Sequence, residues 1–434
     1  MSSKAKTKAI KPEGKSTLTP QLRFPEFRDA AGWKPVTLQE ASVPVTERVG
    51  QRKLTPVSIS AGIGFVPQAE KFGRDISGNQ YQLYTLVRDG DFVFNKGNSL
   101  KFPQGCVYLL QGWGQVAAPN VFICFRLKDG YSNGFFQNCF EQNQHGRQLK
   151  KHITSGARSN GLLNISKETF FGVEIPTPSP AEQQKIAECL GSVDELIAAQ
   201  ARKLGALKTH KAGLMQQLFP REGETQPRRR FPEFASTGEW EEKRLEDLAK
   251  RRSGHTPNKS YPEYYNGGIK WVSLADSKRL DRGLISETEI EISEEGIENS
   301  SAVLLPAGTV LISRDAGIGK SAVMSVPMAV SQHFIAWSCK PRLLSNWFLY
   351  HLLQNTKPVF EMAATGSTIK TIGLQFFIDL KFRVPSLPEQ QRIADCLTSL
   401  DVLITAQAQR LEALKTHKKG LMQELFPSLE GFEA

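Results

Sequence analysis

Several features are missing from this sequence of 434 residues, and each absence excludes a class of protein. No run of about 18 apolar residues occurs, which excludes a transmembrane helix. The first twenty residues lack the apolar stretch of a secretory signal. The six cysteines include no CxxC pair and the seven histidines show no metal-ligand spacing, so we expect reduced structural thiols and no metal site.

Motifs of nucleotide-using and DNA-modifying enzymes are missing as well. Gly319-Lys320-Ser321 is similar to the end of a phosphate-binding loop, but Arg314 stands where that loop requires glycine. The sequence has no Pro-Pro-aromatic motif of an adenine methyltransferase and no Pro-Asp pair that would begin a nuclease carboxylate cluster. We therefore expect no catalytic residue and no cofactor bound by this chain.

Positive charge, in contrast, is in excess. A formal net charge of +11 favours a polyanionic partner, most often nucleic acid, although many basic proteins bind none. Residues 1–20 contain five lysines and one glutamate among Ser, Thr and Pro, which predicts a disordered basic arm.

The chain is a tandem duplication, because segments at the start and end of each half recur in one register, 207 residues apart. The matching pairs are Arg23–Phe27 with Arg230–Phe234, Trp33 with Trp240, Leu38 with Leu245, Glu182–Gln184 with Glu389–Gln391, Lys208–Lys211 with Lys415–Lys418, and Gly213–Gln216 with Gly420–Gln423. We name Arg23–Phe27 and Arg230–Phe234 the opening motifs. Between the matches, residues 41–175 and 247–383 differ almost completely, which indicates one scaffold that carries two different inserts.

Each half ends in a segment whose apolar residues follow alternating steps of three and four, the pattern of a long helix paired with another helix. The predicted seam residues are Ile186, Leu190, Val193, Ile197, Leu204, Leu207 and Leu214 in the first half, and Ile393, Leu397, Leu400, Ile404, Leu411, Leu414 and Leu421 in the second. Pro180 and Pro388 suit a first helical turn, and Pro220 and Pro427 follow the expected ends.

The two helices are expected to pair with each other. About 38 residues at 1.5 Å per residue give a helix of roughly 57 Å. Gln200, Gln407, Lys211 and Lys418 interrupt the seam, as polar residues that fix register do. We expect an antiparallel pair related by a pseudo-twofold axis; the alternative is one core helix in each half.

The inserts contain short β-branched and aromatic runs separated by Gly and Pro, which predicts strand-rich domains with small helices near 134–149 and 344–355. Gly90–Lys96 and Gly308–Arg314 share one pattern, a strand that ends in a polar residue and a cation before a loop with glycine. Such an end presents Lys96 or Arg314 to a phosphate or a guanine edge. A solvated strand end explains either cation alone equally well.

Further candidates for DNA contact lie in polar loops that contain glycine. They are Asn98, Ser99, Lys101, Arg158, Asn160, His255, Asn258, Lys259, Lys320 and Lys370. Any one of them alone is more simply an ordinary surface residue, so the prediction concerns the set.

The opening motifs and the two terminal helices resemble the conserved regions of type I restriction-modification specificity subunits. Ser253–Lys259, continued by Gly267–Val272, resembles the start of a target recognition domain in that family. Val57–Ser60, Gly64–Gln68 and Gly90–Lys96 resemble a different subtype of recognition domain. The resemblance covers nearly all of 20–427, with one departure at His255, where such domains often have glycine.

The resemblance implies an α+β protein in which two strand-rich target recognition domains are separated by two long helices, paired as an antiparallel coiled coil with a pseudo-twofold internal repeat. The implied divisions are a disordered basic arm at 1–20, recognition domains at 21–175 and 231–383, spacer helices at 176–220 and 384–427, a linker at 221–230 and a tail at 428–434.

The resemblance also implies a function in phage defence. The chain would be a non-catalytic, DNA-binding subunit in the bacterial cytoplasm that recognises a gapped site on double-stranded DNA. That site would be asymmetric, because the inserts differ. Two methyltransferase subunits would use S-adenosylmethionine to methylate adenine N6, and two motor-nuclease subunits would use ATP and Mg. This chain itself would bind no cofactor.

Two other functions are alternatives to this one. A fused methyltransferase or nuclease requires a catalytic motif that the sequence lacks. A coiled-coil adaptor, or a degenerate specificity subunit without active DNA readout, explains the helices but leaves the positive charge and the paired inserts unexplained.

Overall fold

The computed structural model describes residues 18–97, 102–153, 163–366 and 370–427. The chain divides into two compact units: unit 1 comprises Met1–Ala199 and Glu412–Ala434, and unit 2 comprises Gln200–Leu411. Each unit therefore contains residues from both repeats. In the part of the chain that the structure describes, no helix combines the length and apolar character needed to cross a membrane.

Two helices of 39 residues, α6 (Pro180–Leu218) and α12 (Leu387–Leu425), confirm the predicted long helices. Pro180 is the first residue of α6 and Pro388 the second residue of α12. Proline suits a first helical turn, because backbone N–H groups there have no partner within the helix and the missing N–H of proline costs no hydrogen bond. All the predicted seam residues are buried or half-buried.

Polar contacts between α6 and α12 occur at the positions that interrupt the seam. In unit 2, Gln200 Nε2 donates to Gln407 Oε1 at 2.8 Å, and Lys211 Nζ lies 2.5 Å from Asp401 Oδ1. The later residue on α6, Lys211, contacts the earlier residue on α12, Asp401, so the two segments in unit 2 are antiparallel. In unit 1, Lys418 Nζ lies 2.8 Å from Asp194 Oδ1.

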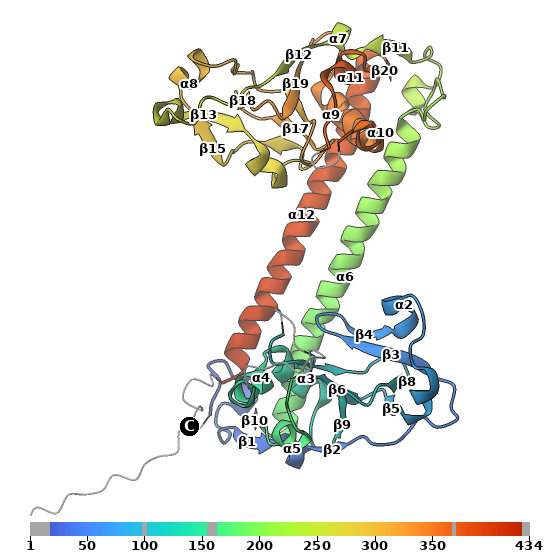
Figure 1. Ribbon diagram of the computed structural model, residues 1–434, viewed down its shortest axis with the longest axis vertical. Coiled ribbons are helices and arrows are strands. Elements are labelled where there is room, and N and C mark those ends of the chain that lie inside the picture. Colours follow the sequence, from blue (N-terminus) through green and yellow to red (C-terminus); the bar gives the residue numbers. More distant parts are fainter. Residues whose placement is uncertain (1–17, 98–101, 154–162, 367–369, 428–434) are drawn as a thin grey trace, which may run out of the picture. The chain divides into compact units, whose positions relative to one another are not determined.

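Unit 1 contains two four-stranded sheets with short helices beside them (Figure 1). One sheet has the order β2 (Ser42–Pro44), β9 (Ile123–Leu127), β6 (Asp91–Asn95), β7 (Cys106–Leu109), and the other β4 (Gly64–Pro67), β3 (Thr55–Ser60), β8 (Gln115–Ala118), β5 (Thr85–Arg88). The helices are α1 (Leu38–Ala41), α2 (Gln68–Phe72), α3 (Asn133–Glu141), α4 (Gln144–Leu149) and α5 (Lys167–Phe171). Buried phenylalanines of β6, β9, α3 and α5 form the main core, which includes Leu425 and Phe426 from the end of α12.

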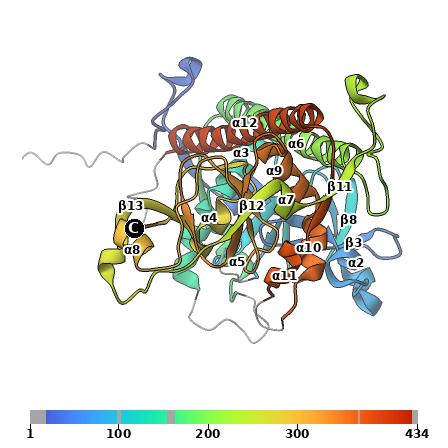
Figure 2. The same ribbon diagram turned by 90° about the horizontal axis from the view of Figure 1, so that it is seen from above.

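Unit 2 is built on a five-stranded and a three-stranded sheet. Their orders are β12 (Ala249–Ser253), β19 (Phe334–Cys339), β16 (Val310–Ser313), β17 (Ser321–Met324), β14 (Leu284–Ile285), and β15 (Ile290–Ile292), β13 (Tyr265–Val272), β18 (Ala329–Val330). The helices are α7 (Leu245–Leu248), α8 (Glu294–Glu298), α9 (Asn346–Asn355), α10 (Lys357–Ala363) and α11 (Leu374–Ile378). Within this unit, β13 and α8 lie at one end and α10 and α11 at the other (Figures 1 and 2).

Both inserts share one core sheet although their sequences differ. The order β2-β9-β6-β7 in unit 1 is repeated as β12-β19-β16-β17 in unit 2. The two strands that the sequence pairs by pattern, β6 and β16, hold the same place, and each follows a glycine with positive φ, Gly90 at 92° and Gly308 at 81°. The small helices predicted near 134–149 and 344–355 are confirmed as α3, α4 and α9.

The opening motifs are held to the starts of the long helices by buried ion pairs. Arg23 Nε and Nη2 donate to the two carboxylate oxygens of Glu182, each at 2.7 Å, and Trp33 Nε1 donates to Glu182 Oε1 at 3.2 Å. Arg230 makes the same pair with Glu389, at 2.9 and 2.5 Å. This contact explains why both partners recur together in the two halves.

Each opening segment also joins a two-stranded antiparallel sheet with the strand that precedes a long helix. These sheets are β1 (Lys34–Thr37) with β10 (Glu174–Thr177), and β11 (Glu241–Arg244) with β20 (Lys381–Val384). Leu18, which falls within the span expected as a basic arm, forms a bridge with Trp33 and is buried; residues 1–17 lie outside the described residues.

Candidate nucleic-acid interface

Loops of unit 2 meet at one edge of its five-stranded sheet. The ends of β12 and β16 lie there beside the start of β19, since Ser253 pairs with Ile335 and Ser313 with Phe334. Ser321, the first residue of β17, is next to this edge, because Ile312 is its partner. The sequence-predicted candidates of the second half lie in or next to these loops.

The loop after β12 carries His255, Asn258 and Lys259, and all three are exposed. It crosses the end of β18 so closely that a Cβ on Gly254 would lie 1.7 Å from Val330 O, which only glycine avoids. His255 N donates to Val330 O at 3.1 Å, so the backbone here is fixed while the imidazole side chain faces solvent.

Arg314, the cation after β16, is held by two neighbouring loops. Its backbone N donates to His333 O at 3.0 Å, and its Nε donates to Ile372 O at 3.1 Å. The half-buried guanidinium is therefore oriented by the chain that follows Lys370, and Lys370 itself is exposed. The structure thus brings Arg314 and Lys370 to the same edge.

Lys320 has its ammonium bonded within the protein. Its Nζ donates to Ser277 O at 3.0 Å and to Ser277 Oγ at 3.1 Å. Ser321 opens strand β17 and is buried, whereas a phosphate-binding loop leads into a helix. Gly319-Lys320-Ser321 therefore leads into a strand and not into the helix that follows a phosphate-binding loop.

In unit 1, Lys96 follows β6 as Arg314 follows β16. Lys96 is half-buried, and its carbonyl accepts a bond of 2.8 Å from Leu163 N. The preceding Asn95 is held by a bond from its Nδ2 to Ile59 O at 2.7 Å. The other candidates of the first half lie outside the described residues; they are Asn98, Ser99, Lys101, Arg158 and Asn160.

Four polar residues at the edge of unit 2 were missed by the sequence prediction. His333 Nδ1 lies 2.6 Å from Asp315 Oδ2, and Thr256 Oγ1 donates to Gln332 Oε1 at 2.5 Å. These contacts join loops distant in sequence, so no spacing shows them. The one available signal was the polar run Ser331-Gln332-His333 directly before an apolar strand.

The comparison with protein families gives one match. The model of the type I restriction modification DNA specificity domain matches residues 79–209 and 237–416. Each matched range includes much of one insert and part of the long helix that follows it.

Curated relatives match over parts of their length. The type I restriction enzyme MjaIX specificity subunit of Methanocaldococcus jannaschii is 29% identical over 198 residues, 45% of each chain. The type I restriction enzyme EcoR124I/EcoR124II specificity subunit of Escherichia coli is 32% identical over 173 residues, 38% of this chain and 42% of that one. The chain thus spans less than half the length of these two relatives.

Solved structures share the fold over most of this chain. The type I restriction-modification system S subunit from M. genitalium has a TM-score of 0.60 at 15% identity, and the match covers 95% of this chain and 100% of that one. A chain from a study of complex assembly and conformational transition of the type I R-M system has a TM-score of 0.54 at 19% identity, covering 92% and 98%.

Proposed function

Since the chain belongs to the family of type I restriction modification DNA specificity domains, we propose that it is the sequence-reading subunit of a type I restriction-modification complex. It binds a bipartite, gapped and asymmetric site on double-stranded DNA, one half through each insert. The observation that carries the proposal is the shared sheet order, β2-β9-β6-β7 and β12-β19-β16-β17, with different loops at equivalent strand ends.

Base reading in one half-site is assigned to the edge of unit 2. A guanidinium is planar, and a hydrogen bond from Nε, as in Arg314, fixes the orientation of its two Nη groups, which suits the O6 and N7 acceptors of guanine in the major groove. The exposed His255, Asn258, Lys259 and Lys370 contact bases or phosphates beside it, and phosphate contacts set the register. Lys320 supports the loop through Ser277.

The long helices form an antiparallel coiled coil with a pseudo-twofold axis and set the gap between the half-sites. Three contacts support this part of the proposal. Gln200 contacts its own repeat equivalent, Gln407, as a pair on such an axis would. Lys211–Asp401 and Lys418–Asp194 are one contact repeated, since 207 residues separate the members of each equivalent pair.

The chemistry belongs to the partners. Two methyltransferase subunits with S-adenosylmethionine receive the adenine flipped out of the duplex. Two motor-nuclease subunits use ATP and Mg to translocate and cut unmodified DNA. This chain is non-catalytic, holds no cofactor and directs both kinds of subunit to the site.

The experiment that tests the proposal is methylation mapping by long-read sequencing. A host free of DNA methylation expresses the chain with its cognate methyltransferase subunit, and a second host expresses the methyltransferase subunit alone. We expect N6-methyladenine in both halves of one asymmetric gapped motif, and only in the first host. Unmethylated DNA from a complex shown to assemble would instead favour an adaptor or a degenerate subunit.

A further inference from the structure

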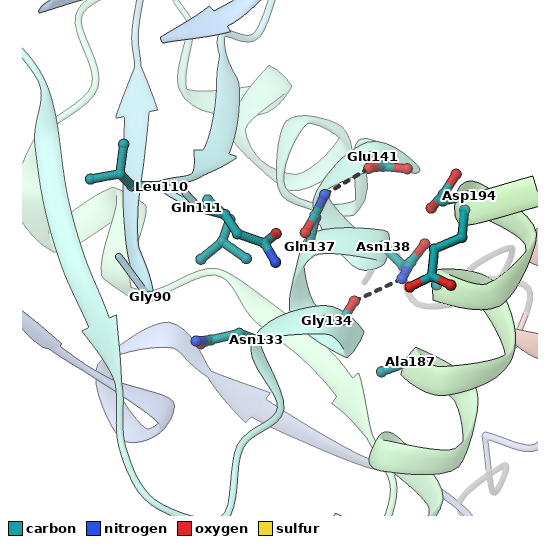
Figure 3. A pocket seen from close by; sticks show the side chains of 13 residues that line it. Gly90, Leu110, Gln111, Asn133, Gly134, Gln137, Asn138, Glu141, Ala187 and Asp194 are labelled. Atoms are coloured by element: carbon teal, nitrogen blue, oxygen red, sulfur yellow. Dashed lines mark hydrogen bonds between the residues drawn. The ribbon is translucent and has the colours of Figure 1, made fainter. Parts of the chain in front are cut away.

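Unit 1 contains a cavity of about 690 Å³ between α3, α6 and the β6–β7 sheet (Figure 3). Where the two helices approach each other, the cavity is lined by Gly134, Ala187 and Gly191. These small residues have no side chain long enough to fill the space. The polar lining residues are Gln111, Asn133, Gln137, Asn138, Glu141, Asp194 and Glu195.

The electrostatic character of this cavity is negative. Glu141, Asp194 and Glu195 supply three carboxylates, and Lys418 beside them supplies one ammonium, 3.0 Å from Glu141 Oε2 and 2.8 Å from Asp194 Oδ1. None of the described residues that line the cavity is a lysine or an arginine. The site therefore repels phosphate and cannot belong to the proposed DNA surface.

One lining side chain lacks a hydrogen-bond donor. Asn138 is 6% exposed, and its Nδ2 donates to Gly134 O at 2.7 Å, which fixes the orientation of the amide. Among the described residues, none donates to Asn138 Oδ1. A buried acceptor without a donor destabilises the protein unless a ligand supplies the donor.

Helix α9 of unit 2 provides an internal comparison for α3. The backbone N of Ser132, before α3, donates to Gln183 Oε1, and the backbone N of Ser345, before α9, donates to the equivalent Gln390, both at 2.9 Å. Counted from these two serines, Gly134 and Gln137 of α3 correspond to bulky aromatic residues of α9.

In unit 2 the corresponding space is occupied. Trp347, Tyr350 and His351 stand where α3 has Gly134, Gln137 and Asn138, and their rings pack together with centroids 5.7 and 5.1 Å apart. His351 Nε2 lies 3.0 Å from Oγ1 of Thr398, which replaces Gly191. The open cavity is thus a property of the first repeat and not of the scaffold that both repeats share.

We propose that this cavity binds a basic side chain, an arginine or lysine, that projects from a partner protein. Such a cation offers only donors, and a guanidinium offers five, which matches carboxylates together with the Asn138 amide oxygen. The identification of the partner as the methyltransferase subunit rests on the proposed function. A free small cation such as a polyamine has the same chemistry and is the other possible source.

The test fills the cavity without removing a structural contact. Gly191→Leu is chosen because a Cβ at Gly191 meets no atom within 4 Å, and because leucine favours a helix over glycine. Gly205→Leu is the matched control, since its Cβ is equally unobstructed on the same helix and Gly205 does not line the cavity. Glu195→Gln and its control Glu188→Gln, exposed on the same helix, remove one charge each.

Two probes are titrated against the full chain and its variants: the cognate methyltransferase subunit by biolayer interferometry, and agmatine by calorimetry. We expect Gly191→Leu and Glu195→Gln to raise the Kd of one of the two bound methyltransferase subunits roughly ten- to hundred-fold, as loss of charged hydrogen bonds does, and to leave the other unchanged, because unit 2 lacks the cavity. Both control variants should stay close to wild type.

The outcomes separate the sources of the cation. If the subunit binds all variants equally while Gly191→Leu abolishes agmatine binding, the site takes a free cation and the partner assignment is wrong. If neither probe distinguishes the variants, the proposal is overturned. The agmatine arm uses the isolated chain, so it remains informative even if methylation mapping rejects the proposed function.

Discussion

Glu182 and Glu389 are among the most deeply buried charged residues of the described chain, since each is only 1% exposed. A carboxylate that leaves water loses hydration, and only a close cation and further donors replace it. Arg23 and Trp33 do so for Glu182, and Arg230 does so for Glu389. The opening motif thus supplies the charge that neutralises the carboxylate at the helix start, which is why the two recur together in both halves.

Replacement of Arg23 by alanine tests this interpretation. The variant leaves Glu182 buried without its cation, so we expect the free energy of unfolding of unit 1 to fall by about 3–5 kcal/mol. Lys185→Ala removes the exposed ion pair with Glu26, where both side chains are nearly half exposed, and should cost much less. Urea denaturation of both variants measures the difference, and equal losses would contradict the argument.

His145 makes the stability of unit 1 depend on pH. It is buried against Phe94 and Phe140, and burial lowers the pKa of its imidazole to about 4. The unfolded chain binds this proton below pH of about 6.5 and the folded chain does not, so stability falls between about 6.5 and about 4 as pH is lowered. The slope is at most about 1.4 kcal/mol per pH unit.

The His145→Leu variant should lose that part of the pH dependence. Denaturation at a series of pH values measures it, with His152→Leu as the control because His152 is exposed. A slope that is unchanged in His145→Leu would assign the pH dependence to other groups.

Replacement of Arg314 by alanine tests the proposal that unit 2 reads the bases of one half-site. Arg314→Ala should relax or abolish recognition of one half-site only, at a cost of about 1–3 kcal/mol, because a bidentate base contact is lost. Methylation mapping of the variant measures the effect, with the exposed Arg342→Ala as control. Equal weakening on all sequences would make Arg314 a phosphate contact.

At the scale of helices and strands, the sequence predicts what depends on local periodicity. The bounds of α6 and α12 follow from heptad spacing and prolines, and β6 and β16 follow from one recurring pattern. The common sheet order is not predictable, because each pairing, such as that of β2 with β9, joins segments distant in sequence. The same reason hides the contact of His333 with Asp315.

The polar contacts between the helices should be energetically coupled. In a double-mutant cycle of Lys211→Met and Asp401→Asn, we expect a coupling of about 1–2 kcal/mol, since these side chains are 15% and 25% exposed. The exposed pair of Lys415 and Glu412 is the control and should show far weaker coupling. Additive effects at Lys211 and Asp401 would show that the contact does not fix the register.

For the whole molecule, the proposed function ties target symmetry to the inserts. A chimera in which residues 247–383 also replace 41–175 carries two identical readers on the proposed twofold scaffold. Its methylated motif should become an inverted repeat of one half-site. Methylation mapping beside the wild-type chain tests this, and a motif that stays asymmetric would refute the proposed symmetry.

Each compact unit is closed by residues from the opposite repeat. Phe426 packs on Trp33 and Phe135 in unit 1, with ring centroids 5.9 and 5.4 Å apart, and Phe219 packs on Trp240 and Phe348 in unit 2, at 6.5 and 5.5 Å. A polypeptide with one repeat would therefore lack the phenylalanine that completes its own core and carry the one that completes another copy. Two such polypeptides would complete each other by exchanging helix ends, so this chain has the organisation of a domain-swapped homodimer fused into a single gene product.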